Sequence, residues 1–305
     1  MANKLKKKIV FLGDDNSINI EIINKAHNYL KNKVEYILIG NIDDLSKYLN
    51  KLSSQLNVNE IYNPFIFENY KKNSLNIFNV ENVSKKKFKN LLNQIDIANN
   101  LSNYLKIDLV TMPINKSVFK KEIKFIGMTE YLSKINNKNT FMLMVGERFS
   151  VIPLTTHINL NDVKKNLNIK YIKKSLNEII VQIEREFYDL NFQSIKFLCF
   201  NPHCGENNTI GFEDRTISKS IFQFKKVNGP YSADSAFKDL KDDNSLFISM
   251  YHDQCLIPFK ILNKKAINLT IGLNYRRLSP AHGTANDIKF KNSADVSSYL
   301  ACMQY

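Results

Sequence analysis

The chain has 305 residues, of which 44% are hydrophobic, so it can bury a large core divided between two lobes. No apolar run approaches the ~18 residues of a membrane-spanning helix, and the apolar run after the basic start is too short for a signal peptide, so we expect a cytoplasmic protein. The net charge of +14 comes mainly from dispersed lysines, a pattern that does not indicate a nucleic-acid-binding face. The four cysteines lack CxxC spacing, so we expect reduced thiols.

Strand-like and helix-like segments alternate over the first third of the chain. The segments that read as strands are residues 8–13, 34–40, 74–80 and 108–113. The segments with helical periodicity are residues 18–31, 43–52 and 84–106. Such alternation predicts crossover units, and therefore an α/β fold with a largely parallel sheet that is covered on both faces.

The rest of the chain predicts more α/β structure. The apolar segments 141–147 and 149–157 are nearly adjacent, which indicates a hairpin. Further strands are expected at 194–200, 246–251 and 267–273, and helices at 170–190, 214–226 and 294–305. Because the chain has no G-x-G-x-x-G motif, nothing favours a dinucleotide site of the Rossmann type.

Four of the five histidines come directly after strand-like runs. They lie in the segments TTH (155–157), NPHCGE (201–206), YHDQ (251–254) and SPAHGTA (279–285). Open α/β sheets bind ligands at the carboxyl ends of their strands, and imidazole is the commonest protein ligand for divalent metals. The pattern alone leaves a metal site and purely structural histidines both open. His27 lies in a helical segment, and we expect a surface or packing role for it.

Two cations and an amide follow the same strands. Lys260 and Arg277 provide positive charge suited to a phosphate or a carboxylate, and Asn268 begins a strand where its amide needs partners. Each of them could equally be an ordinary surface cation or an amide satisfied by the protein.

Eight motifs together resemble the 4-hydroxythreonine-4-phosphate dehydrogenase family. They are TMPINK (111–116), GMTEYL (127–132), TTHINL (155–160), NPHCGE (201–206), GPYSADSAF (229–237), MYHDQCLIPFK (250–260), INLTIGL (267–273) and RLSPAHGTA (277–285). The resemblance runs in order from about Asp108 to Asp287 and is weaker before that point.

The resemblance implies a two-domain α/β fold like that of isocitrate and isopropylmalate dehydrogenases, with the active site in the cleft between the domains. The first domain would comprise residues 1–124 and 266–305. The second, residues 125–265, would carry the metal ligands and the contacts of a homodimer whose active site is shared between subunits.

The resemblance also implies an activity in pyridoxal 5′-phosphate (vitamin B6) biosynthesis. The family oxidises 4-phosphooxy-L-threonine with NAD to a β-keto acid, which decarboxylates to 3-amino-2-oxopropyl phosphate. A divalent metal (zinc, magnesium, cobalt or manganese) would be bound by His157, His203 and His252, with ligands from both subunits. Thr129, Lys260, Asn268 and Arg277 would surround the substrate, and Lys260 and Asp253 would be catalytic. The resemblance leaves the NAD-contacting residues unassigned.

The chain departs from the family pattern near the substrate residues. Met128 stands where the family usually has histidine, and the loop GDDNSINIE (13–21) lacks the family's glycines and prolines. Ala281 and Leu278 replace a usual aspartate and threonine. One interpretation is that Arg276 supplies the phosphate donor that Met128 cannot. Two other activities stay open: oxidation of another phosphorylated hydroxy acid, and metal-dependent hydrolysis using the three histidines with Asp253.

Overall fold

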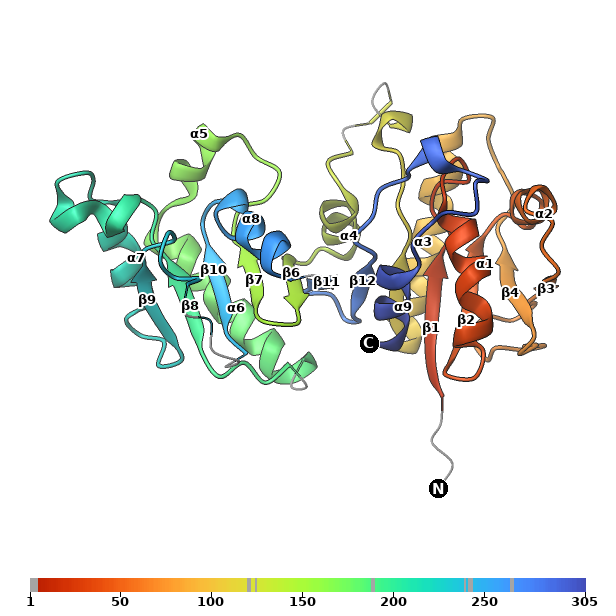
Figure 1. Cartoon of the computed structure of the whole chain (residues 1–305), viewed down its shortest axis with the longest axis horizontal. Helices are drawn as coiled ribbons and strands as arrows, with labels where there is room; N and C mark the ends of the chain where they lie inside the picture. The colour runs from red at the N-terminus through yellow and green to blue at the C-terminus, as the bar shows by residue number, and fades with distance from the viewer. Residues whose placement is uncertain are drawn as a thin grey trace. The chain divides into compact units, whose positions relative to one another are not determined.

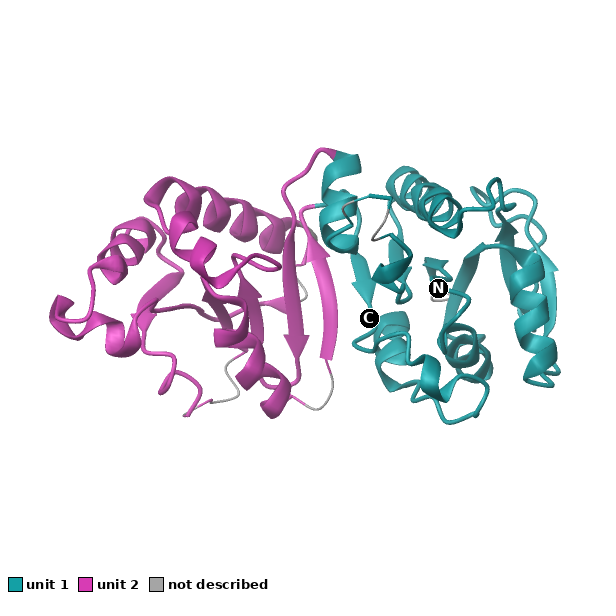
Figure 2. Cartoon of the chain, turned by 90° about the horizontal axis from the view of Figure 1, so that it is seen from above, with its two compact units in different colours: residues 1–136, 273–305 teal, residues 137–272 magenta. Residues whose placement is uncertain are grey.

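The computed structural model divides into two compact α/β units, shown in Figures 1 and 2. Unit 1 comprises Met1–Asn136 and Leu273–Tyr305, and unit 2 comprises Asn137–Gly272. The structure describes residues 5–119, 122–123, 125–187, 190–238, 240, 244–263 and 266–305. The α/β class predicted from the alternating segments is confirmed. In the described part of the chain, every helix is too short or too polar to cross a membrane.

Unit 1 is built on a parallel sheet with the strand order β3-β4-β2-β1-β5-β12. Its strands are β1 (Lys6–Phe11), β2 (Val34–Gly40), β3 (Asn57–Glu60), β4 (Ser74–Asn79), β5 (Asp108–Thr111) and β12 (Arg277–Ser279). Its helices are α1 (Asn19–Leu30), α2 (Ile42–Lys51), α3 (Lys87–Leu105), α4 (Met128–Asn136) and α9 (Ser297–Gln304), with the short turns η1 (Lys116–Val118) and η5 (Asn286–Ile288). Figure 2 shows helices on both faces of this sheet, as expected for parallel strands.

The central strand β1 is buried along most of its length. Ile9, Val10 and Phe11 have no exposed surface, which explains why this strand reads as a continuous apolar run. Lys8 is equally buried, and its ammonium group lies 2.7 Å from a carboxylate oxygen of Asp108 on the neighbouring strand β5. Burial lowers the pKa of Lys8, although Asp108 acts in the opposite direction. This buried ion pair therefore ties the two central strands together.

Unit 2 has the strand order β11-β6-β7-β10-β8-β9. Its strands are β6 (Phe141–Gly146), β7 (Ser150–Pro153), β8 (Ile195–Leu198), β9 (Val227–Tyr231), β10 (Leu246–Ser249) and β11 (Ala266–Ile271). Its helices are α5 (Leu160–Val163), α6 (Ile169–Glu186), α7 (Glu213–Ile221) and α8 (His252–Leu262), with the 3₁₀ segments η2 (Lys164–Asn166) and η4 (Pro202–Asn208). The antiparallel pairing of β6 with β7 confirms the predicted hairpin, and β10 pairs in parallel with both β7 and β8.

The two units divide at positions that differ from the domain boundaries expected from the sequence. The expected boundaries, 124 and 265, fall on residues outside the described ranges. Residues 125–136 group with unit 1, because Leu132 of α4 packs into its core. Residues 266–272 group with unit 2, because β11 pairs with β6 over its whole length.

Two expectations for single residues can be compared with the structure. His27 is buried, and its Nδ1 atom lies 2.8 Å from the hydroxyl oxygen of Tyr36, so it has the packing role rather than the surface role. The four cysteines carry free thiols, as their spacing predicts.

Candidate functional site

Two of the expected metal ligands lie side by side in unit 2. His157 follows the end of β7, and His252 begins α8 just after the end of β10. Because β7 and β10 are parallel neighbours, their carboxyl ends lie at the same edge of the sheet. The ring centroids of the two histidines are 6.2 Å apart. A single divalent ion with bonds to nitrogen of about 2.0–2.1 Å can be held between two imidazoles at such a separation.

The orientation of His252 is set by its neighbour in the sequence. The Nδ1 atom of His252 lies 2.7 Å from Oδ1 of Asp253, and the Tyr251 hydroxyl donates to the other carboxylate oxygen at 3.1 Å. The hydrogen bond from His252 is the main cause that lowers the pKa of Asp253. An ionised carboxylate only accepts hydrogen bonds, so Nδ1 donates to Asp253, and in the neutral imidazole Nε2 is then the atom that can bind a metal. Asp253, expected to be catalytic, therefore contacts and orients His252.

The third expected ligand, His203, lies on a strained turn after β8. Residues 203–207 of η4 all have left-handed backbone angles, with φ between 43° and 79°. Each non-glycine residue in this conformation costs roughly 1–2 kcal/mol, so the turn must be held by its surroundings. At Gly205 a Cβ atom would come within 2.8 Å of the Gly211 carbonyl oxygen, so no larger residue fits there.

The buried carboxylate of Asp214 holds the start of this turn. Its Oδ1 accepts from the Phe200 backbone N–H at 2.6 Å, and its Oδ2 accepts from the backbone and side-chain nitrogens of Asn201, each at 3.1 Å. The His203 side chain itself is 60% exposed, and its Nδ1 lies 3.8 Å from Oδ2 of Asp234. Thus the His203 side chain is exposed to solvent on a turn whose start is held by the Asp214 carboxylate.

The three expected ligands do not form one cluster within a single chain. Among the described residues, no group of three or more His, Cys, Asp or Glu side chains is arranged to hold a metal ion. The structure brings His157 and His252 together, and it gives His203 a different acidic neighbour.

Two expected substrate residues also belong to unit 2. Lys260 lies exposed in the last turn of α8, and its charge contributes to lowering the pKa of Asp253 after the hydrogen bonds from His252 and Tyr251. Asn268 lies on β11 opposite Met144 of β6. Its amide oxygen is buried and has no hydrogen-bond partner among the described residues. An unsatisfied buried oxygen of this kind is suited to a ligand that brings a donor.

The other two expected substrate residues meet in unit 1. Arg277 opens β12 and is only 5% exposed. Its Nε donates to the Thr111 hydroxyl at 2.8 Å, and its Nη1 donates to the Thr129 hydroxyl at 3.4 Å. Burial lowers the pKa of Arg277 to about 10, so the guanidinium is still charged at neutral pH. It is a fixed cation with its geometry set by two hydroxyl groups.

The structure gives Arg276 a protein partner, which argues against the interpretation that it replaces a phosphate donor. Its guanidinium forks onto Asp108, with Nε 2.9 Å from Oδ1 and Nη2 3.1 Å from Oδ2. Because neighbouring residues on an extended segment point to opposite sides, Arg276 and Arg277 do not serve one ligand. Met128, where the family usually has histidine, packs against the hydrophobic core of unit 1.

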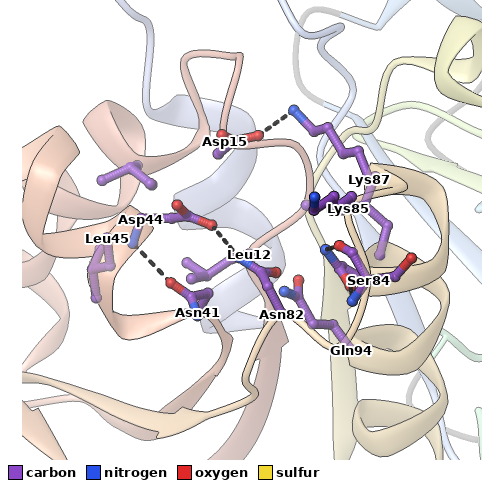
Figure 3. A pocket seen from close by; sticks show the side chains of 14 residues that line it. Leu12, Asp15, Asn41, Asp44, Leu45, Asn82, Ser84, Lys85, Lys87 and Gln94 are labelled. Carbon is purple, nitrogen blue, oxygen red and sulfur yellow. Dashed lines mark hydrogen bonds and ion pairs between the residues drawn. The ribbon is translucent and has the colours of Figure 1, made fainter.

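Sequence reasoning gave no role to His282 and missed a pocket in unit 1. The Nδ1 atom of His282 lies 2.9 Å from the Gly283 carbonyl oxygen, while Nε2 is buried with no partner in the described part of the chain. The pocket has a volume of about 300 Å³ and lies beyond the ends of β1, β2 and β4 (Figure 3). The signal for it was the row of polar residues after these strands, at Asp15, Asn41 and Asn82.

Comparisons with known proteins agree with the motifs. Residues 32–305 match the family described as "Pyridoxal phosphate biosynthetic protein PdxA". A 4-hydroxythreonine-4-phosphate dehydrogenase from Hydrogenobaculum is 42% identical over 62% of this chain and 61% of its own length. One from Sulfurihydrogenibium is 32% identical over 98% of this chain and 96% of its own.

A solved structure has the same fold over nearly the whole chain. The 4-hydroxythreonine-4-phosphate dehydrogenase from Klebsiella pneumoniae superimposes with a TM-score of 0.82 at 25% identity, covering 98% of both chains. The family profile covers most of the chain, and the Sulfurihydrogenibium relative is similar from end to end. The chain therefore belongs to the PdxA family of pyridoxal phosphate biosynthetic proteins.

Proposed function

We propose that the protein is an NAD-dependent 4-hydroxythreonine-4-phosphate dehydrogenase that requires a divalent metal ion and acts in the cytoplasm. It would oxidise 4-phosphooxy-L-threonine to a β-keto acid, which then loses CO2 to give 3-amino-2-oxopropyl phosphate. Membership of the PdxA family carries this proposal. The pair formed by His157 and His252, with Asp253 behind it, supports the metal requirement.

The residues that would hold the metal fit its chemistry. The Nε2 lone pair of His252 is free because Nδ1 donates to Asp253, and the imidazole of His157 lies close by. His203 of the partner subunit would complete the set, because a single chain does not bring all three together within its described residues. A divalent ion bound there would polarise the oxygen at which the substrate is oxidised.

Exposed apolar side chains around these histidines support a homodimer. Ile158 and Leu160, which follow His157, are 43% and 60% exposed, and Ile257 on the helix of His252 is 57% exposed. Phe212, which follows the turn that carries the third expected ligand His203, is 64% exposed. A two-fold axis that covers one group with the other would create two identical sites, each with ligands from both chains.

The remaining residues would bind the substrate and handle its protons. Arg277 would supply a fixed positive charge for the anionic substrate, with Thr111 and Thr129 holding its geometry. The buried amide oxygen of Asn268 would accept a hydrogen bond from the substrate. Lys260, a cation on the same helix as His252, would donate a hydrogen bond to the substrate oxygen.

Formation of NADH from 4-phosphooxy-L-threonine tests the proposal directly. We expect NADH to form with the metal present, and to stop forming after chelation and resume when the metal is restored. Release of inorganic phosphate without NAD would instead indicate the hydrolase. If the enzyme oxidised a different phosphorylated hydroxy acid faster than 4-phosphooxy-L-threonine, the methionine at position 128 would indicate that its substrate differs from that of the family.

Mixing inactive variants tests the shared site. A heterodimer of a His203→Ala chain and a His252→Ala chain has one intact site of two, so random mixing should restore about a quarter of wild-type activity. A His157→Ala chain mixed with a His252→Ala chain is the matched control, because both ligands come from the same side of the interface. That mixture should stay inactive. Recovery in the control, or none in the first mixture, would contradict the proposed arrangement.

A further inference from the structure

The pocket of unit 1 has the position of a ligand site in an open α/β sheet. It is lined by residues that follow three parallel strands: Gly13 after β1, Asn41 after β2 and Asn82 after β4. Its volume of about 300 Å³ is at the lower end of the range of small-molecule pockets, about 300–1,000 Å³. None of the residues assigned above to metal or substrate binding lines it.

The pocket is lined by the cation Lys85 just before the start of helix α3. Helix α3 starts at Lys87 without a side-chain cap and without an acidic residue in its first turn. Lys87 pairs with Asp14 and Asp15, and Lys86 pairs with Glu122, but the ammonium group of Lys85 has no partner within the described ranges and lines the pocket. Cations at a helix N-terminus destabilise the helix, and an anion bound there relieves this.

The pocket is also lined by a buried side-chain amide, that of Gln94, which lacks a hydrogen-bond partner among the described residues. Gln94 is only 6% exposed and lines the pocket, and its side chain forms no hydrogen bond in the part of the chain that the structure describes. The nearby amides are occupied: Asn41 accepts from two backbone N–H groups at the start of α2, and Asn90 bonds to the backbone of Ser84. Figure 3 shows the Gln94 amide turned toward Asn82 and the cavity. Both the oxygen and the NH2 group of this amide are therefore available to a ligand.

The spacing of these groups defines the size of the ligand. Lys87 and Gln94 are seven residues apart on α3, which is about 10 Å along the helix axis. The pocket lining also includes the Asp44 carboxylate and the Asn82 amide, and Nδ2 of Asn82 donates to Oδ2 of Asp44 at 3.4 Å. The buried side chains of Leu45 and Leu91 provide apolar contact surface. A ligand that fits has an anion near the start of α3, a flat group with hydrogen-bonding edges near Gln94, and hydroxyl groups that reach Asp44.

A nucleoside 5′-phosphate has these three parts. Its phosphate suits Lys85 and the start of α3, its ribose hydroxyls suit Asp44, and amide side chains such as Gln94 pair with base edges. In dinucleotide-binding folds the phosphate lies at the turn after the first strand, but here that turn carries Asp14 and Asp15, whose carboxylates share Lys87 at the start of α3, so Lys85 is the cation left for a phosphate. We propose that this pocket binds a nucleoside 5′-phosphate group, with its phosphate at the N-terminus of α3 instead.

Calorimetric titration of the purified protein with AMP tests this proposal. Replacing Lys85 with alanine or Gln94 with methionine should each weaken AMP binding by about tenfold or more, since each removes one hydrogen-bonding group from the ligand. Lys85→Arg should keep most of the affinity. Lys89→Ala is the matched control, because Lys89 is an exposed lysine on the same helix that does not line the pocket. Thermal unfolding of each variant shows whether its fold is intact.

The proposal fails if AMP does not bind, if Lys89→Ala weakens binding as much as Lys85→Ala, or if inorganic phosphate binds as tightly as AMP. Competition identifies the source of the group: displacement of AMP by NAD means that the pocket takes the adenylate half of the cofactor. Simultaneous binding of both means that it takes a free nucleotide. The titration needs no turnover, so its result is separate from the result of the dehydrogenase assay.

Discussion

The carboxylate of Asp214 is expected to hold the loop that presents His203, and replacing it with asparagine tests this. The substitution keeps the shape of the side chain but replaces one acceptor oxygen by an NH2 group. The remaining oxygen can accept from Phe200, while the NH2 group faces the two nitrogens of Asn201 that now donate to Oδ2. Two hydrogen bonds to a charged group are lost, each worth roughly 1.5–3 kcal/mol. We expect the free energy of unfolding to fall by about 3–6 kcal/mol.

The variant should also lose affinity for the divalent metal. Without its anchor, the left-handed turn at residues 203–207 can relax to a more favourable backbone conformation, which moves His203. Urea denaturation followed by circular dichroism gives the stability, and calorimetry gives the metal affinity. Glu184→Gln is the control, because it breaks an exposed pair with Lys226 that is worth about 0–1 kcal/mol. If Asp214→Asn matched this control in both measurements, the carboxylate would have no part in holding the turn.

Three further substitutions separate stability from function. Arg276→Ala should leave the KM for the phosphorylated substrate unchanged and lower the free energy of unfolding by about 2 kcal/mol, because it removes the fork onto Asp108; a raised KM would restore the phosphate-donor interpretation. Asn268→Ala should lower kcat/KM with little change in thermal stability, since its amide oxygen has no partner among the described residues. Burial alone would raise the pKa of Asp108, but Lys8 and Arg276 outweigh it, so the folded pKa lies below the unfolded value. The stabilisation by Asp108 is therefore complete above the ordinary aspartate pKa of about 3.9 and is lost as the pH falls through the folded value. The stability difference between wild type and Asp108→Asn, measured by urea denaturation, should be full at pH 7 and shrink in acid.

The sequence predicts the long, regular parts of the fold well. Strands such as β1 are buried on both faces and read as apolar runs, and helices such as α3 have a clear period. It does not predict β3 or β12, which are short and partly polar and exist because a longer neighbour pairs with them. Helix α8 was also missed, since its apolar residues show little one-sided pattern and Pro258 lies inside it.

For the candidate site, the motifs identify residues but not their partners. The closeness of His157 and His252 depends on the pairing of β7 with β10, whose strands lie almost a hundred residues apart. The ion pair of Arg276 depends on Asp108 lying on the neighbouring strand β5, which cannot be read from the local sequence. The left-handed turn at His203 could not be predicted either, because only one of its five residues is glycine.

The insertion of unit 2 into unit 1 has a consequence for synthesis on the ribosome. When the chain has been made as far as Gly272, all of unit 2 is present, but β12 and α9 of unit 1 do not yet exist. Strand β5 then has an open edge, because its later partner β12 has not been made. At roughly 5–20 residues per second, the last segment follows within seconds. During that interval unit 2 can fold as a finished body, while the nascent unit 1 exposes a sheet edge that a chaperone can bind.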